Sequence, residues 1–261
     1  MSLLEPDEPP AVEIVNPQGT SEAVLICDHA SARLPRRLGD LGLSEAQRLE
    51  HIGWDIGAAA VARRLSLAID APLVLTGYSR LAIDCNRPPG VPTSIPVLTG
   101  SVEVPGNRDL SEADKAARVT GLFEPYHAAI AALLDGRAAA GKASAVLAIH
   151  SFTPHLGDAR PWNIGVTYGR DRRLAGCFLE TLQAFWPGIV VGDNQPYAVT
   201  DSGDYAMPVY GERRGLLHVL IELRQDGVTD ATGQIRWADR LAACWRQFAG
   251  DLPALALQPV S

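Results

Sequence analysis

Two histidines occupy similar positions in the sequence and could share one metal ion. His29 and His150 each follow a short apolar run, and turn-rich sequence comes after each of them. Apolar runs bounded in this way are typical of strands buried on both faces. The carboxyl ends of such strands border the ligand crevice of an open α/β sheet. A single histidine there usually caps a strand or forms a hydrogen bond, but the repeated context favours a hydrolytic zinc site.

A zinc site that performs hydrolysis keeps three protein ligands and an open position for water. His51 and Asp55 lie four residues apart on one face of an expected helix, where they could point into the site or form a solvated pair. Asp55 has apolar neighbours, and an unpaired acid among them is costly. We therefore favour Asp55 as the third ligand and His51 as a contact to a ligand or to the substrate. Asp28 competes for this role, since it could bind the metal or orient an imidazole.

Glu222 is the one acid in the otherwise apolar segment at residues 216–223. Burial of a carboxyl group in such a strand raises its pKa. A raised pKa suits a general base that takes a proton from the attacking water. The alternative is a structural ion pair with Arg224 or another arginine.

A polar segment at residues 78–88 could bind a substrate carboxylate. Arg80 and Arg87 can each grip a carboxylate with two parallel hydrogen bonds, and Asn86 adds a neutral donor. Asp84 could hold one of the arginines in place. Arginines near strand ends also often have a purely structural role.

Strands alternate with helices along the whole chain, which predicts a three-layer α/β/α fold with a mostly parallel, mixed central sheet. Expected strands cover residues 22–28, 72–76, 81–84, 145–150, 164–168, 189–192 and 217–223. Expected helices cover residues 44–67, 111–124, 125–140, 171–186 and 234–249, with Pro125 as an interruption. Ser44 with Gln47, and Ser111 with Asp114, form capping-box patterns at two helix starts. Residues 1–20 read as an irregular lead-in, and we expect a single domain over residues 1–261.

Composition narrows the class of protein. The 261 residues are 47% hydrophobic and 20% charged, with a net charge of −7, which is ordinary for a globular protein with a sizeable core. Without a basic tract, nucleic acid is not an expected partner. Without a membrane-length apolar run or a signal-peptide pattern, we expect a cytoplasmic protein. The widely spaced cysteines read as reduced thiols; they are Cys27, Cys85, Cys177 and Cys244.

These segments resemble the N-formylglutamate amidohydrolase family over about residues 15–250. The matching segments are CDHAS at 27–31, HIGWDIG at 51–57, SRL at 79–81, DCNR at 84–87, IHSFTP at 149–154, RPW at 160–162, DNQPY at 193–197 and IELRQD at 221–226. The family's histidine-degrading enzymes usually carry Pro-His-Ser-Gly where this chain has residues 28–31. Close relatives often carry His in place of Tyr210, so the chain resembles a side branch.

The resemblance implies a zinc-peptidase-like or phosphorylase/hydrolase-like fold, related to the zinc carboxypeptidases. It implies that zinc is bound by a His, an acid and a second His, with a Glu as base and an Asn-Arg pair for a substrate carboxylate. The corresponding residues are His29, Asp55 and His150 as ligands, Glu222 as base, and Asn86, Arg87 and Arg80 for the carboxylate.

Three functional hypotheses follow. The first is a zinc-dependent amidohydrolase that cleaves a small N-acylated acidic amino acid such as N-formylglutamate. The second is a non-catalytic protein that binds small acidic ligands on the same scaffold. The third is a cysteine hydrolase that uses Cys27 or Cys85, which lie near the candidate site residues. The metal content of the purified protein separates the first hypothesis from the second.

Overall fold

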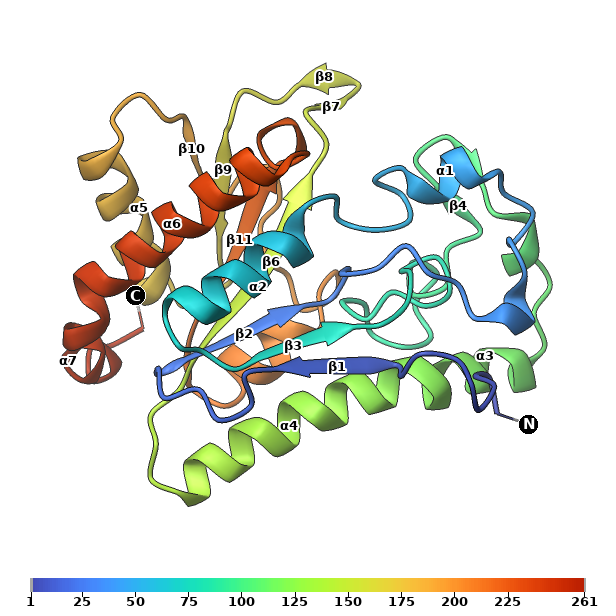
Figure 1. Ribbon diagram of the computed structural model, residues 1–261, viewed down its shortest axis with the longest axis horizontal. Coiled ribbons are helices and arrows are strands. Elements are labelled where there is room, and N and C mark those ends of the chain that lie inside the picture. Colours follow the sequence, from blue (N-terminus) through green and yellow to red (C-terminus); the bar gives the residue numbers. More distant parts are fainter. Residues whose placement is uncertain (1, 261) are drawn as a thin grey trace.

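A mixed seven-stranded sheet forms the centre of the chain in the computed structural model, which describes residues 2–260 (Figure 1). The strands follow the order β1-β3-β2-β6-β11-β9-β10 across the sheet. They are β1 Val12–Val15, β2 Ala23–Cys27, β3 Leu73–Thr76, β6 Ala145–Phe152, β9 Ile164–Thr167, β10 Val191–Asp193 and β11 Leu217–Arg224. The β1–β3 and β11–β9 pairs are antiparallel, and the other four pairs are parallel.

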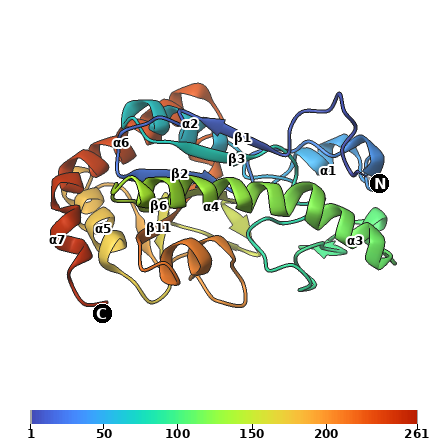
Figure 2. The same ribbon diagram turned by 90° about the horizontal axis from the view of Figure 1, so that it is seen from below.

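Helices cover both faces of this sheet. The longer ones are α2 Ala58–Ala68, α4 Glu124–Ala139, α5 Arg173–Phe185 and α6 Ala231–Phe248. The shorter ones are α1 Glu45–Leu49, α3 Glu112–Arg118, α7 Leu252–Ala256, η1 Arg36–Leu38, η2 Pro105–Asn107, η3 Val119–Phe123, η4 Met207–Glu212, η5 Gln225–Gly227 and η6 Ala249–Asp251. Apolar residues of α2, α5 and α6 share one core with the sheet, and those of α4 share another. Figure 2 shows α4 lying along one face of the sheet, where it contacts β3 and β1. The predicted three-layer α/β/α fold is therefore confirmed.

Two short hairpins lie apart from the central sheet. One pairs β4 Leu98–Thr99 with β5 Val102–Glu103, inside the proline-rich loop after β3. The other pairs β7 His155–Leu156 with β8 Asp158–Ala159, just after β6. In Figure 1 the second hairpin projects beyond the carboxyl end of β6.

The helix predicted over residues 44–67 is interrupted. Its capping box forms as expected, with the Ser44 side chain accepting from the N–H of Gln47 and the Gln47 side chain accepting from the N–H of Ser44. Helix α1 ends at Leu49, however, and α2 starts only at Ala58. The segment between them is a series of turns.

Two glycines explain this interruption. A Cβ atom on Gly53 would lie 2.1 Å from the carbonyl oxygen of Arg48. Gly57 has a φ of +80°, and a Cβ atom there would lie 2.3 Å from the carbonyl oxygen of Val228. Only glycine fits these approaches. Asp55 therefore lies in a turn between two helices, and the prediction that it shares a helix face with a histidine is wrong.

Two further predictions of local structure are wrong. Residues 81–84 form a turn, because Ala82 donates its N–H to the carbonyl of Ser79 and Asp84 donates to the carbonyl of Ser94. Pro125 does not interrupt its helix. The preceding segment η3 is a π-helix in which the N–H of Glu124 bonds to the carbonyl of Val119. Pro125 lies in the first turn of α4, where the missing backbone N–H of a proline is tolerated.

The lead-in predicted to be irregular over residues 1–20 contains an ordered strand. Strand β1 pairs antiparallel with β3 and closes one edge of the sheet. Its burial pattern is only partial, so the period-2 apolar pattern that marks a half-buried strand is weak over these four residues.

A row of polar residues crosses three parallel strands at their carboxyl ends. Glu222 of β11 lies opposite His150 of β6. The β2–β6 register pairs Ile26 with Ala148, and two further residues along each strand bring Asp28 beside His150. The same face is apolar earlier in these strands. The sheet thus changes from core to polar site along a single face.

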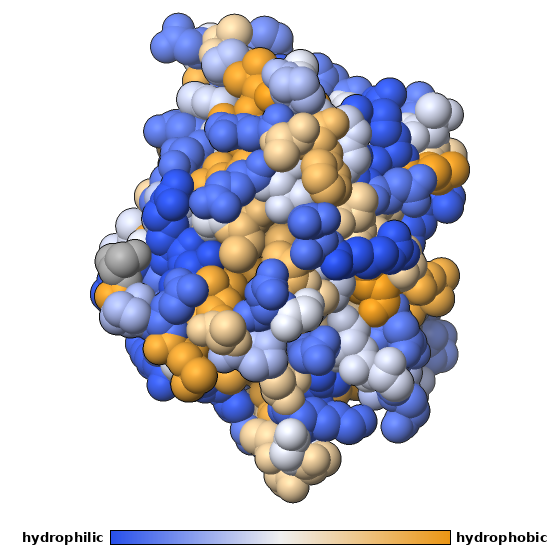
Figure 3. Space-filling view, turned by 90° about the vertical axis from the view of Figure 1, so that its left-hand side faces the viewer, coloured by the Kyte–Doolittle hydropathy of each residue, from blue (hydrophilic) through white to orange (hydrophobic). Residues whose placement is uncertain are grey.

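The described residues form no helix that is both long and apolar enough to cross a membrane. Figure 3 shows the face at the left-hand side of Figure 1, where hydrophobic side chains are interspersed with hydrophilic ones.

Candidate active site

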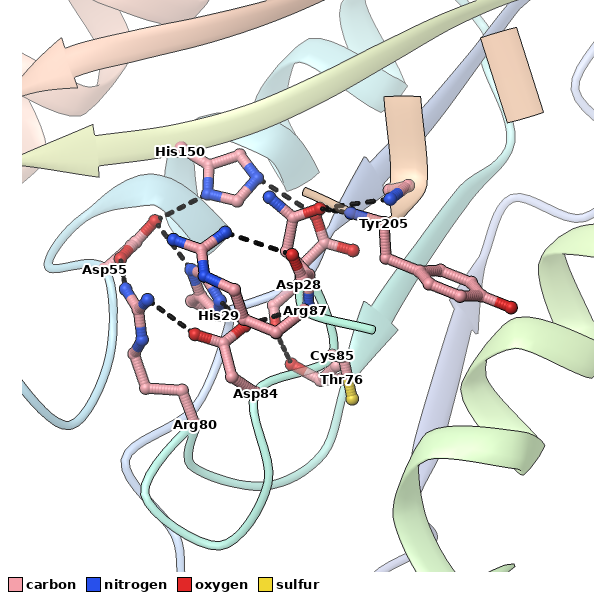
Figure 4. A network of polar contacts seen from close by, with 12 residues as sticks. Asp28, His29, Asp55, Thr76, Arg80, Asp84, Cys85, Arg87, His150 and Tyr205 are labelled. Carbon is pink, nitrogen blue, oxygen red and sulfur yellow. Dashed lines mark hydrogen bonds and ion pairs between the residues drawn. The ribbon is translucent and has the colours of Figure 1, made fainter. Parts of the chain in front are cut away.

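His29 and His150 turn the same ring atom toward one carboxylate. The Nδ1 atom of His150 lies 2.9 Å from Oδ2 of Asp55, and Nδ1 of His29 lies 3.3 Å from the same oxygen (Figure 4). One potential ligand atom from each of these three residues lies within 4.8 Å of the other two. All three side chains are buried. The structure therefore brings together the three residues expected to bind a metal.

A further buried carboxylate contacts the outer nitrogen of each imidazole. The Nε2 atom of His29 lies 2.8 Å from Oδ1 of Asp84, and Nε2 of His150 lies 2.9 Å from Oδ2 of Asp28. A carboxylate in this position accepts the Nε2 proton, which leaves Nδ1 as the ring atom that faces inward. Asp28 thus contacts the outer side of His150, behind the three clustered residues.

Backbone hydrogen bonds fix Asp55 between the two histidines. Its N–H donates to the carbonyl of His29 at 3.0 Å, and the N–H of Ser151 donates to its Oδ2 at 3.2 Å. Burial opposes ionisation of this carboxyl group, but the charge of His29 and the hydrogen bond from His150 hold its pKa well below the usual range. Asp55 is therefore an ionised oxygen donor at neutral pH.

The residues of this cluster fit a divalent metal ion. Burial opposes the charged form of both rings, but hydrogen bonds to Asp28 and Asp55 raise the pKa of His150 well above its ordinary value. The neighbouring carboxylates also raise the pKa of His29. Such surroundings favour positive charge, whether carried by protons or by a metal. Two imidazole nitrogens and one carboxylate oxygen form a donor set that suits zinc.

Glu222 lies in the same cavity with one oxygen unpaired. Its side chain is buried, and Oε2 has no hydrogen-bond partner among residues 2–260. Burial raises the pKa of this carboxyl group to about 7. Arg224, considered above as an ion-pair partner, contacts Asp226 at 2.8 Å instead. An unpaired carboxyl group that changes charge near neutral pH can exchange a proton with water.

Arg80 contacts the acids of the cluster. Its Nη2 atom donates to Oδ2 of Asp84 at 2.5 Å, and its Nη1 lies 3.6 Å from Oδ1 of Asp55. Figure 4 shows the guanidinium reaching toward both carboxylates. Arg80 therefore neutralises acids of this chain, as expected for an arginine held by Asp84.

Asn86 and Arg87 bind a segment that is distant in sequence. The Oδ1 atom of Asn86 accepts from the N–H groups of Tyr205 and Ala206, at 3.1 and 3.0 Å, and its Nδ2 donates to Oδ1 of Asp204 at 3.0 Å. The Nη1 atom of Arg87 lies 3.3 Å from the same Asp204 oxygen. It also donates to the carbonyl of Gly203. These contacts pin the loop before η4 across one side of the cavity.

Asp204 is the functional candidate that the sequence did not identify. It lies in a segment whose sequence indicates only a loop, and nothing in its immediate neighbours indicates a contact with Asn86. The pairing of Asn86 and Arg87 with an acid of the same chain appears only in three dimensions.

One cavity of about 370 Å³ contains the candidate residues. The predicted site residues that line it are His29, Asp55, His150, Glu222, Arg80, Asn86 and Arg87. His51 and Asp204 also line it. Burial lowers the pKa of His51, so this ring is neutral at pH 7 and can donate or accept a hydrogen bond.

Three other residues singled out by the sequence lie outside the lining of this cavity. Burial raises the pKa of the Cys27 and Cys85 thiols well above the usual value. A reactive cysteine requires the thiolate, so the burial of these two thiols opposes a cysteine hydrolase. The hydroxyl of Tyr210 lies 2.9 Å from Nδ1 of His127 and donates to the backbone carbonyl of the same residue.

Comparisons with known proteins give a consistent result. A family model described as N-formylglutamate amidohydrolase matches residues 21–229. A solved structure of a gene product from Agrobacterium tumefaciens is 36% identical, with a TM-score of 0.92 over 96% of this chain and 99% of that chain. The structure of an N-formylglutamate amidohydrolase from Ralstonia eutropha is 17% identical, with a TM-score of 0.66 over 94% of this chain and 98% of that chain, which is a likeness of fold. No curated protein matches the chain. The matched range includes each candidate residue from His29 to Glu222.

Proposed function

The chain belongs to the N-formylglutamate amidohydrolase family, whose name describes hydrolysis of an amide bond, and we propose that it is a zinc-dependent amidohydrolase acting on small N-acyl amino acids. The observation that carries this proposal is the placement of His29, Asp55 and His150 beside Glu222 in one cavity. A metal-binding cluster next to an unpaired acid is the arrangement that hydrolytic zinc sites require.

The proposed metal ligands are Nδ1 of His29, Nδ1 of His150 and the carboxylate of Asp55. Asp84 and Asp28 would orient the two rings through their Nε2 atoms, at 2.8 and 2.9 Å. When bound, a zinc ion lowers the pKa of a water molecule and polarises the amide carbonyl.

Glu222 is the proposed general base. Its carboxylate accepts a proton from the water molecule whose oxygen forms the new bond to the amide carbon. The carbon–nitrogen bond then breaks, and the proton passes from Glu222 to the leaving amine. The products are a carboxylic acid and an amino acid. The pKa of about 7 matches this use near neutral pH, because the same group must accept and then release a proton.

Arg87 is the proposed contact for the substrate carboxylate. All its polar contacts within residues 2–260 are made by Nη1, so Nε and Nη2 remain for a ligand. A carboxylate held there fixes the orientation of the amide, which contributes to catalysis by positioning. Arg80 keeps its pairing with Asp84 and maintains the geometry of the acids.

The first experiment is a metal analysis of the purified protein together with an assay of amine release. N-formylglutamate, the compound in the family's name, is compared with other N-formyl amino acids. We expect about one zinc per chain, hydrolysis of at least one of these compounds, loss of activity after chelation and recovery on addition of zinc. A protein that holds no metal but still binds N-acyl amino acids would support the binding-protein alternative and refute the proposal.

A further inference from the structure

The pair expected to grip a substrate carboxylate already holds a carboxylate of this chain. Oδ1 of Asp204 accepts from Nδ2 of Asn86 at 3.0 Å and lies 3.3 Å from Nη1 of Arg87. Oδ2 of Asp204 accepts from the N–H of Thr200 at 2.9 Å, which closes the loop around it. The Asp204 side chain is 16% exposed and lines the cavity. A negative charge is thus built into the substrate-binding wall.

Two arginines that line the cavity are paired with acids of the chain, whereas Arg160 beside it has no acidic partner among residues 2–260. Arg80 contacts Asp84 and lies near Asp55, while Arg87 contacts Asp204. The guanidinium of Arg160 stacks over the ring of Tyr197 at 4.8 Å and is not part of the cavity lining. The free edge of Arg87 can accept one carboxylate. A second carboxylate placed on the Asp204 side of Arg87 would face the negative charge of Asp204.

Apolar side chains line the cavity alongside polar ones such as His51, Thr153 and Gln225. The apolar residues that line the cavity include Phe152, Leu156, Tyr197, Val199 and Leu220. Leu156 is 52% exposed and Tyr197 is 46% exposed. An apolar group of a ligand would remove part of these side chains from water, and such burial favours binding in proportion to the area covered.

We propose that Asp204 is a specificity-determining residue that restricts the site to N-acyl amino acids with one carboxylate and an apolar side chain. This rests on the proposed amidohydrolase function and names its substrate class. A side-chain carboxylate, as in N-formylglutamate, is rejected because it would face Asp204 and the apolar side chains of the lining. Placing an unpaired charge against the wrong ligand is a general means of discrimination.

The test compares hydrolysis of N-formyl-leucine and N-formylglutamate by the zinc-loaded full chain. We expect the wild type to favour N-formyl-leucine by at least about tenfold in kcat/KM, the scale of one unfavourable contact with a charged group. Asp204→Asn keeps the volume and an acceptor for Thr200 but removes the charge. It should raise kcat/KM for N-formylglutamate by about tenfold relative to that for N-formyl-leucine, mainly through a lower KM.

Asp201→Asn is the matched control. Asp201 lies in the same loop, pairs with Arg170 at 2.9 Å and does not line this cavity. The same loss of charge there should leave the preference unchanged. A second variant, Leu156→Ser, changes an exposed apolar residue of the lining and should lower kcat/KM for N-formyl-leucine alone, so the proposal stays testable even if the loop tolerates Asp204→Asn poorly.

The outcomes separate this inference from the function on which it rests. A wild-type preference for N-formylglutamate, or an equal effect of Asp204→Asn on both compounds, would overturn the inference and leave the amidohydrolase assignment intact. An equal effect would mean that Asp204 controls access rather than selects the side chain. Absence of hydrolysis with every N-acyl amino acid tested would overturn the proposed function itself.

Discussion

Replacing Glu222 with Gln tests the proposed general base at a position where the fold should tolerate the change. The amide has nearly the same volume, and the site already accommodates a neutral group because the pKa of Glu222 is about 7. We expect zinc content and thermal stability close to wild type. We expect kcat to fall by about 10²–10⁴, or about 3–5 kcal/mol in the barrier, with little change in KM.

The pH dependence gives a second reading of the same variant. The base must be ionised, so activity is present above the pKa of Glu222 and is lost as the pH falls through it. With a pKa of about 7 in the absence of a cation, the ionised fraction of Glu222 falls from about nine-tenths at pH 8 to about one-tenth at pH 6. The wild-type rate should therefore have an acidic limb that follows the ionised fraction of Glu222. A bound cation would shift this limb to lower pH, since it favours the carboxylate. At whatever pH the acidic limb of the wild type lies, the Glu222→Gln enzyme should lack that limb.

A suitable control is Glu212→Gln. The Glu212 side chain is 9% exposed, lies outside the cavity and contacts Arg170, so its loss should affect stability and leave kcat of the folded protein unchanged. The assay is amine release from an N-formyl amino acid between pH 5 and pH 9, with the metal content measured on the same samples. A Glu222→Gln enzyme with near-normal kcat, or with the acidic limb retained, would refute the general-base role.

Three other predictions concern the metal and the carboxylate contact. His29→Ala or His150→Ala should each strip the metal, and full zinc content in both variants, by elemental analysis, would contradict the ligand assignment. Asp55→Asn should weaken zinc binding more than Asp28→Asn, because Asp28 contacts only the outer side of His150; titration with a competing chelator would reveal the opposite ranking. Arg87→Lys should lower kcat/KM by about 1–3 kcal/mol for substrates with a free carboxylate but not for their amides, and equal losses would indicate a structural role.

The strand-end histidines could be predicted because their signal is local. A short apolar run before His29 and another before His150 are typical of strands covered on both faces, and β2 and β6 are buried throughout. Once two parallel strands are adjacent, their carboxyl ends meet at one edge. The position of Glu222 follows from the same reasoning, since β11 pairs with β6 in parallel.

The position of Asp55 could not be derived in the same way. The capping box at Ser44 involves residues three apart, and it was predicted correctly. The start of the second helix, α2, depends instead on the fit of Gly57 against Val228, a residue 171 positions away in the sequence. Local helical periodicity carries no information about such a contact. Asp55 was selected because its charge needed a partner, although the helix assigned to it was wrong.

Contacts between side chains distant in sequence were the least predictable part of the site. The sequence left Asp28 and Asp55 as alternatives, because either carboxylate follows a plausible structural element. Only the orientation of the His150 ring distinguishes the two acids, because Nδ1 points toward Asp55 and Nε2 points toward Asp28. Asp204 is a stronger case, since its contact with Asn86 joins residues 118 positions apart.

Charge balance links these contacts to the proposed metal. The acids Asp28, Asp55 and Asp84 are buried around His29 and His150, with Arg80 as the permanent cation nearby. The negative field of these acids raises the pKa of both histidines, which favours one additional proton on each ring. A divalent cation that displaces those two protons leaves the net charge of the cluster unchanged, and the imidazoles become neutral ligands. The buried carboxylates, which would be costly alone, are therefore compensated in either state. The arrangement that makes the acids tolerable in the fold is also the one that would draw a metal ion into the site.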